Sequence, residues 1–293
     1  MNESKVLLDI ENLMFSMTQR SYIWTDFEGE YHRLLDQAQA IYDQELQYSP
    51  LIESYFALMP ERRCRRNREL FSNQDLFQDF QYSLRTQHRK FLDDLKSKNK
   101  RNSRKLRDYF DSILEQHCKL LLVRVDLAYR YDANTSLETF DRDVKILVNR
   151  IQNKDTCFKG QVGYAYRLEQ GGKSKGYHCH LLVIYNGSKH CRDSYLAQEI
   201  GELWQERITD DQGLFYNCNQ KDHKRRYELM DSLGIGMIER KDPKAVENAY
   251  TAIRYLASPD KQTQYLRACL TERMRQFHTG QRRRTIDDRR VNP

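Results

Sequence analysis

Two histidines separated by one residue, His178 and His180, are the side chains in this sequence best placed to bind a metal ion. They lie in the run YHCHLLVIY, whose β-branched and apolar residues are typical of a β-strand. Because successive side chains of a strand alternate between its two faces, both imidazoles project from the same face. Two imidazoles fixed on one rigid surface can supply half of a metal site, whereas an isolated pair of this kind is usually only polar sheet surface.

A glutamate in the preceding segment is the candidate third ligand. Residues 161–170, QVGYAYRLEQ, also have a strand pattern, and a six-residue turn, GGKSKG, separates them from the histidines. If the two strands close directly around this turn, Glu169 lies opposite His178 and Arg167 lies opposite His180. A bulge or a one-residue slip would instead move Glu169 to the other face. Two imidazoles and one carboxylate suit Mn²⁺, Mg²⁺ or Zn²⁺, with open positions for a substrate oxygen.

A tyrosine farther along the chain could provide a nucleophile. Asp242 and Pro243 are typical of a helix start, as the capping residue and the first helical residue. Tyr250 belongs to the apolar stripe of this helix and is expected to pack in the core, whereas Tyr255 lies about half a turn away and is expected to face a cleft. A tyrosine hydroxyl can act as a covalent nucleophile when a nearby cation eases the loss of its proton. Most of the nineteen tyrosines are nevertheless expected simply to pack.

The elements around these residues indicate an α+β fold. Residues 119–129 and 234–240 have strand patterns in addition to the hairpin, and a helix capped by Ser136 lies between the first strand and the hairpin. Strands and helices alternate, but one connection is a hairpin. We therefore expect a mostly antiparallel central sheet flanked by helices.

Glycine is distributed unevenly along the 293 residues. Only Gly29 precedes Gly160, whereas eleven glycines lie between Gly160 and Gly280, both included. The glycine-poor part, with helix-like apolar spacing in residues 76–95, predicts an all-helical region before the sheet. The predicted organisation is a helical N-terminal region of unassigned role at 1–110, an α+β domain at 111–280 and a basic C-terminal tail at 281–293.

Basic residues are clustered, although the net charge of +7, from 49 basic and 42 acidic residues, is modest. The clusters lie in residues 62–68, 85–107 and 282–290. Clustered cations suit the phosphates of a nucleic acid, and a solvated helix face explains any single cluster equally well. No leader-like start or long apolar run is found, and the seven cysteines are scattered without a CxxC pair. We therefore expect a cytoplasmic protein with reduced thiols that does not associate with membranes.

Three segments, in this order, resemble the replication proteins of inoviruses and prophages, a branch of the HUH endonuclease superfamily. They are RVDLAYR at 124–130, YRLEQGGKSKGYHCHLLVIYNG at 166–187 and AYTAIRYLASPDKQ at 249–262. The resemblance covers roughly residues 119–264. It implies an RRM-like palm and a rolling-circle replication initiator of a bacterial host cell. It further implies that Mn²⁺ or Mg²⁺ is bound by His178, His180 and Glu169.

The resemblance also implies that Tyr255 attacks single-stranded DNA or hairpin origin DNA and stays linked to the 5′-phosphate until the strands are rejoined. The superfamily carries this residue as Tyr-x-x-Lys, whereas here Ser258 takes the lysine position and Lys261 is the nearest lysine. Arg167 and Lys261 are expected to steady phosphate charge. Further candidates for DNA contacts are Lys173, Lys175 and Arg124, although a solvated side chain is the more typical role for Arg124. Asp126 could equally border the site or face solvent.

Two other functions are compatible with the sequence. A DNA-binding or regulatory protein on the same fold that no longer nicks is favoured by the displaced lysine. A zinc hydrolase using a metal-bound water would retain activity without Tyr255. Tyr164 and Tyr166 could stack unpaired bases, but ordinary packing is more typical of strand tyrosines. A host helicase is a further candidate partner.

Overall fold

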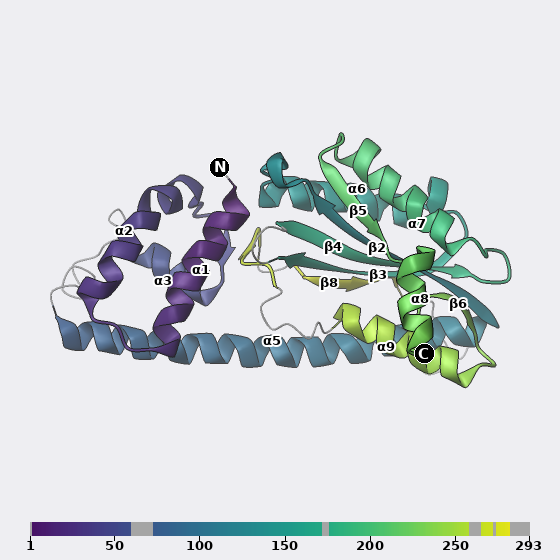
Figure 1. Cartoon of the computed structure of the whole chain (residues 1–293), viewed down its shortest axis with the longest axis horizontal. Helices are drawn as coiled ribbons and strands as arrows, with labels where there is room; N and C mark the ends of the chain where they lie inside the picture. The colour runs from purple at the N-terminus through teal and green to yellow at the C-terminus, as the bar shows by residue number, and fades with distance from the viewer. Residues whose placement is uncertain (1, 60–72, 172–175, 258–264, 272–273, 282–293) are drawn as a thin grey trace, which may run out of the picture.

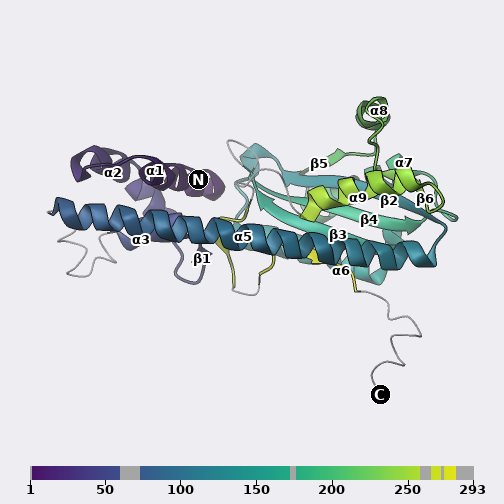
Figure 2. The same cartoon turned by 90° about the horizontal axis from the view of Figure 1, so that it is seen from below.

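The computed structural model describes residues 2–59, 73–171, 176–257, 265–271 and 274–281. Figure 1 shows an elongated molecule with a group of helices at one end and a sheet with its covering helices at the other. One helix of 43 residues, α5 (Gln74–Gln116), runs along both parts (Figures 1 and 2). The predicted α+β class, with N-terminal helices followed by a mostly antiparallel sheet, is confirmed.

The N-terminal helices pack on the first half of α5. They are α1 (Glu3–Gln19), α2 (Trp24–Ile41) and α3 (Pro50–Ala57), and the two-residue strand β1 (Gln47–Tyr48) lies between the last two. The rings of Trp24, Phe27 and Phe77 contact one another in this core. Helix α5 has neither glycine nor proline and continues past residue 110, so the predicted division at that position falls inside a helix.

Six strands form the sheet, in the order β5-β2-β4-β3-β8, with β6 also paired to β2. Every pairing in this sheet is antiparallel. The strands are β2 (Lys119–Tyr129), β3 (Gln161–Gln170), β4 (Tyr177–Asn186), β5 (Gly213–Asn217), β6 (Gly236–Glu239) and β8 (Phe277–Thr279). The four strands predicted from sequence are present, whereas β5 and β8 were not predicted. A separate two-residue strand, β7 (Ala268–Cys269), pairs with β1.

Different helices cover the two faces of the sheet. On one face, Val123, Val125 and Leu127 pack against α6 (Leu137–Asn153) and α7 (Asp193–Glu202). On the other face, apolar residues of β2, β3 and β4 pack against the second half of α5 and against α9 (Pro243–Ala257). Within the described residues, the remaining short helices are η2 (Tyr131–Ala133), η3 (Thr156–Phe158), the π-helix η4 (Leu203–Ile208) and α8 (Lys221–Leu229).

The helix caps predicted from sequence are present. The Ser136 side chain accepts a hydrogen bond from Thr139 at the start of α6, and Asp242 accepts two at the start of α9. The described helices include none that is long and apolar enough to cross a membrane.

On the sheet face that α5 and α9 cover, the side chains change between apolar and polar along each of the long strands. Apolar or small residues come first along β2 and β3 and polar ones follow, as in Leu120 and Leu122 before Arg124 and Asp126. Because β4 runs antiparallel to both neighbours, the order is reversed there, and its two histidines precede its apolar residues. The apolar halves of the three strands therefore lie under the helices, and their polar halves meet beyond them.

Candidate metal centre

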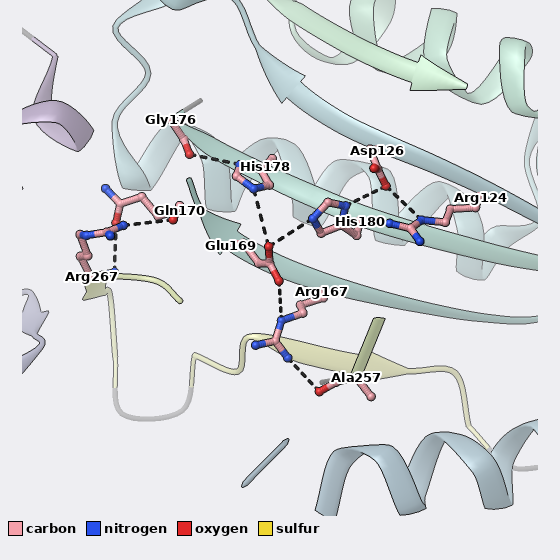
Figure 3. A network of polar contacts seen from close by, with 10 residues as sticks. All are labelled: Arg124, Asp126, Arg167, Glu169, Gln170, Gly176, His178, His180, Ala257 and Arg267. Carbon is pink, nitrogen blue, oxygen red and sulfur yellow. Dashed lines mark hydrogen bonds and ion pairs between the residues drawn. The ribbon is translucent and has the colours of Figure 1, made fainter. Parts of the chain in front are cut away.

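The β3–β4 hairpin has the register that the sequence predicted. Glu169 pairs with His178 and Arg167 pairs with His180. Glu169 Oε2 lies 3.2 Å from His180 Nε2 and 3.7 Å from His178 Nε2 (Figure 3). One donor atom from each of the three side chains lies within 4.8 Å of the other two. Two imidazole nitrogens and one carboxylate oxygen therefore converge, and the group could hold a metal ion.

Arg167 connects this group to two helices. Its Nε donates to Glu169 Oε1 at 2.8 Å, and its Nη1 donates to the main-chain carbonyl of Ala257 at 2.9 Å (Figure 3). The same Nη1 donates to Asn99 Oδ1 at 3.3 Å. Ala257 is the last residue of α9, and Asn99 lies in the middle of α5. Both Arg167 and Glu169 are only 1% exposed, so the carboxylate is held in place by a buried ion pair.

Asp126 on β2 contacts the imidazole of His180 at the nitrogen that does not face Glu169. It pairs with His180 across β2 and β4, and its Oδ1 is 2.7 Å from His180 Nδ1, although this contact is not aligned as a regular hydrogen bond. Arg124 Nε donates to the same carboxylate at 3.2 Å. A carboxylate in this position orients a ligand imidazole and increases its basicity. The sequence alone left open whether Asp126 borders the site or faces solvent, and the pairing of β2 with β4 places it opposite His180.

The N-terminal helix α1 is bonded to the end of the same hairpin. Gln170, next to Glu169, donates through Nε2 to Ser4 Oγ at 2.8 Å. The main-chain oxygen of Gln170 accepts from Arg267 Nη1 at 3.0 Å, and Arg267 Nε donates to Glu11 Oε2 at 2.7 Å. Figure 3 shows Gln170 and Arg267 beside the metal-binding group. The helical region without a chemical motif therefore supports the hairpin that carries the three candidate ligands.

Charges within the group shift the pKa values of its members. Burial raises the pKa of Glu169, but its contacts with both imidazoles and the charges of His180 and Arg167 outweigh it and hold this pKa at about 2. Burial lowers the pKa of His180, but Asp126 and Glu169 raise it to about 9. Burial likewise raises the pKa of Asp126, and His180 and Arg124 bring it well below its usual range. Without a metal ion, a proton on His180 therefore balances the carboxylates at neutral pH.

Metal binding is expected to release this proton, because a protonated imidazole nitrogen cannot coordinate an ion. Since the pKa of His180 is about 9, Mn²⁺ affinity should fall by about tenfold for each pH unit below that value. Calorimetric titrations with Mn²⁺ at pH 7.5, in buffers of different ionisation enthalpy, should show release of about one proton per ion. Asp126→Asn should reduce the release, and an affinity that does not change between pH 7 and pH 9 would contradict the expectation.

Helix α9 reaches the centre through its last turn. Its final carbonyl, on Ala257, accepts the hydrogen bond from Arg167, and Tyr255 lies two residues earlier with 50% of its surface exposed. Tyr250 contacts the ring of Phe110 and donates to Asp111, so it packs between α9 and α5 as its place on the apolar stripe predicted. The helix of the candidate nucleophile therefore ends beside the metal-binding group.

The other residues predicted to act on DNA have varied positions. Arg167 is buried and bonded within the protein, so we assign it a positioning role and do not retain it as a phosphate contact. The Arg124 side chain is 26% exposed and paired with Asp126. Tyr164 and Tyr166 are 9% and 7% exposed and pack in the core on the opposite face. Three predicted residues lie outside the described part of the chain: Lys173, Lys175 and Lys261.

The donor set fits a divalent ion. The carboxylate is ionised and buried, its second oxygen is bonded to Arg167, and one imidazole is backed by Asp126. Comparisons with protein-family models, curated proteins and solved structures found no match to this chain. The donor chemistry is compatible with Mn²⁺, Mg²⁺ and Zn²⁺ and does not select one of them.

Proposed function

We propose that this protein is a rolling-circle replication initiator of a bacterial host, which nicks and rejoins single-stranded DNA with Tyr255 as nucleophile. The observation that carries the proposal is the convergence of Glu169, His178 and His180, with Arg167 joining this group to the last turn of α9. The resemblance of three sequence segments to HUH endonucleases supports the same reaction and favours Mn²⁺ or Mg²⁺ as the ion.

Each residue of the centre has a defined task in this reaction. Glu169, His178 and His180 would hold the ion, which supplies a Lewis acid for a phosphate oxygen. Arg167 fixes the orientation of Glu169, and Asp126 keeps His180 turned toward the centre. These contacts are already formed in the protein, so little reorganisation accompanies the reaction.

The bond changes involve the Tyr255 hydroxyl. Its oxygen attacks phosphorus in line with the bond to the 3′-oxygen. The Tyr255 Oη–P bond forms and the P–O3′ bond breaks, and the net proton transfer is from the tyrosine to the departing 3′-oxygen. The DNA is left with a free 3′-hydroxyl and a 5′-phosphate on the enzyme. The reverse reaction rejoins strands without another source of energy, because the covalent link retains the energy of the phosphodiester.

A basic cleft next to the centre supports a DNA substrate. It measures about 690 Å³ and lies between the middle of α5 and the segment that ends in β8. Its described lining contains one carboxylate, from Asp94, and four cationic side chains, from Lys98, Arg101, Lys105 and Arg275. It also contains the buried Arg167, whose guanidinium is bonded to Glu169 and Ala257. Arg167 belongs to both the cleft and the metal-binding group. A phosphodiester backbone in this cleft would therefore pass close to the ion.

The cleft can be tested through the salt dependence of DNA binding. Replacing Lys98, Arg101 and Lys105 with alanine should lower affinity for a labelled single strand and reduce the slope of log affinity against log salt by about 0.7 for each phosphate that the protein no longer neutralises. Fluorescence anisotropy over a range of NaCl concentrations measures this slope. The matched control replaces three exposed cations of α5 that lie outside the cleft: Lys96, Lys100 and Arg104. Equal slopes for the two triple variants would place the DNA elsewhere.

Covalent capture tests the proposed reaction. Single-stranded DNA incubated with the protein and Mn²⁺ should give an adduct that survives denaturation, and Tyr255→Phe should abolish it. Tyr250→Phe is the control, because it preserves the ring contact with Phe110 and removes only a hydroxyl bonded to Asp111. Cleavage that persists in Tyr255→Phe would favour a metal-bound water as the nucleophile.

A DNA-binding protein that does not nick is the second candidate function. Ser258 at the position of the superfamily's lysine favours it, because that lysine is expected to balance charge on the phosphate. Metal binding and DNA binding without an adduct in the wild-type protein would support this alternative.

A further inference from the structure

A row of paired residues continues across the sheet from the metal centre to an exposed tyrosine. His180 on β4 pairs with Asp126 on β2, and Asp126 pairs with Tyr216 on β5. Directly paired residues share a face, so Tyr216 lies on the same face as the metal ligands. Its strand is two strand spacings from that of His180, about 10 Å. One or two nucleotides of an extended strand would span that distance.

Tyr216 belongs to a cluster of three aromatic side chains, Tyr216, His223 and Tyr227, called here the aromatic platform. The Tyr216 hydroxyl lies 3.1 Å from His223 Nδ1, and the two rings are 5.4 Å apart between centroids. The centroids of His223 and Tyr227 are 5.2 Å apart. Tyr216 is 46% exposed and Tyr227 is 40% exposed, so the platform presents ring surface to solvent while its members support one another.

Helix α8, which carries His223 and Tyr227, is highly exposed. None of its side chains is buried, and Figure 2 shows it standing away from the sheet and its covering helices. Lys224 anchors it through an ion pair of 2.7 Å with Asp193. A helix that buries no apolar face gains little stability from packing. Besides Lys224, this one presents three exposed basic residues, Lys221, Arg225 and Arg226, and two exposed acidic ones. Its surface is therefore suited to an anionic ligand.

We propose that the aromatic platform stacks unpaired bases of single-stranded DNA next to the metal centre. The inference rests on the proposed function for the identity of the strand. Exposed rings beside cations are a common arrangement for binding single strands, because every base has a face that can stack, whatever its sequence. The cleft at the other side of the centre contacts phosphates, and the platform contacts bases. The platform thus fixes which nucleotide reaches the ion.

The test measures binding without chemistry, in full-length protein carrying Tyr255→Phe. Tyr216→Leu and Tyr227→Leu together should weaken binding of a fluorescein-labelled oligothymidylate by at least about tenfold, with an unchanged salt slope. Tyr216→Trp and Tyr227→Trp should retain the affinity. Tyr82→Leu, at a tyrosine of α5 that is 72% exposed, is the matched control and should have no effect.

A second oligonucleotide isolates the contribution of stacking. A strand of abasic sites has phosphates but no bases, so the protein with both tyrosines and the double leucine variant should bind it equally. If the double leucine variant and the protein with both tyrosines bind oligothymidylate with equal affinity, the proposed role of the aromatic platform is wrong. Its exposed apolar neighbours, such as Leu229, would then be a surface for a protein partner.

The platform and the proposed function can fail separately. If the wild-type protein forms the adduct but the leucine substitutions do not alter binding, the platform is wrong and the function stands. If no adduct forms but the substitutions weaken binding of oligothymidylate alone, the platform stands and the nicking reaction is wrong. A wild-type protein that binds no single-stranded DNA would contradict both.

Discussion

Replacing His178 or His180 with alanine is expected to lower Mn²⁺ affinity by more than about a hundredfold, because each supplies one donor atom of the cluster. Partners that only support metal ligands are commonly worth about ten- to a hundredfold, so removal of a ligand should cost more. The same variants should lose metal-dependent adduct formation. Calorimetric titration with Mn²⁺ and the denaturing gel assay measure the two effects separately.

Two further variants show whether the effect is specific to the ligands. Asp126→Asn keeps all three donors and weakens only the contact with His180 Nδ1. About a tenfold loss of Mn²⁺ affinity is therefore expected above the His180 pKa of about 9, where no proton on His180 competes with the ion. His32→Ala removes an exposed histidine of α2 and should leave the affinity unchanged. Wild-type affinity in both ligand variants would mean that the ion binds elsewhere.

Replacing Arg167 with methionine should destabilise the folded protein by about 3–5 kcal/mol. The Glu169 carboxylate is 1% exposed, and the substitution leaves it buried without its guanidinium partner. It also removes the hydrogen bond from Arg167 to the Ala257 carbonyl, which should weaken the attachment of the last turn of α9 to the sheet. Urea unfolding measures the stability, and adduct formation reports the effect on the helix that carries Tyr255.

The lower stability of Arg167→Met should come from the unpaired charge of Glu169 rather than from poorer packing of the methionine side chain. Arg167→Met combined with Glu169→Met should therefore recover much of the stability while still failing to bind Mn²⁺. Arg33→Met is the exposed control, since the Arg33–Glu30 pair lies at the surface and should contribute less than about 1 kcal/mol. A single variant Arg167→Met as stable as the wild type would refute a positioning role for this ion pair.

The parts of the fold that depend on local sequence could be predicted. The ends of β2, β3 and β4 follow from alternating apolar residues and turn residues, which act within a few positions of the chain. The short hairpin turn then fixed the register, so the pairing of Glu169 with His178 was predictable without any long-range contact. The caps of α6 and α9 were predictable for the same reason, because a capping side chain bonds to its own helix.

The parts that depend on long-range contacts could not be predicted. Strands β5 and β8 are too short to show a period, and β8 has three residues that form a strand only because β3 offers an edge. The contact of Asp126 with His180 requires β2 to pair with β4, and that of Arg167 with Ala257 requires α9 to dock on the sheet. The aromatic platform likewise exists only because β5 pairs with β2.

The length of α5 is a further feature of the structure that was not predicted from the sequence. Residues 96–105 are all polar and have no apolar stripe, so their continuity with the helix on either side was not predicted. In the structure this polar stretch forms one wall of the basic cleft, between the N-terminal helices and the sheet. The helix thus lacks an apolar face in the stretch between the core of the N-terminal helices and the core under the sheet, where it packs on neither.

Mass spectrometry of the DNA-linked protein tests the central claim most directly. After reaction with single-stranded DNA and Mn²⁺, nuclease and trypsin would reduce the adduct to a nucleotide on one peptide. Trypsin separates the two tyrosines of this region, because Arg254 lies between Tyr250 and Tyr255, and the peptide YLASPDK contains Tyr255 alone. We predict a nucleotide linked through its 5′-phosphate to this peptide. A nucleotide on the Tyr250 peptide, or cleaved DNA with no nucleotide on any peptide, would contradict the proposed reaction.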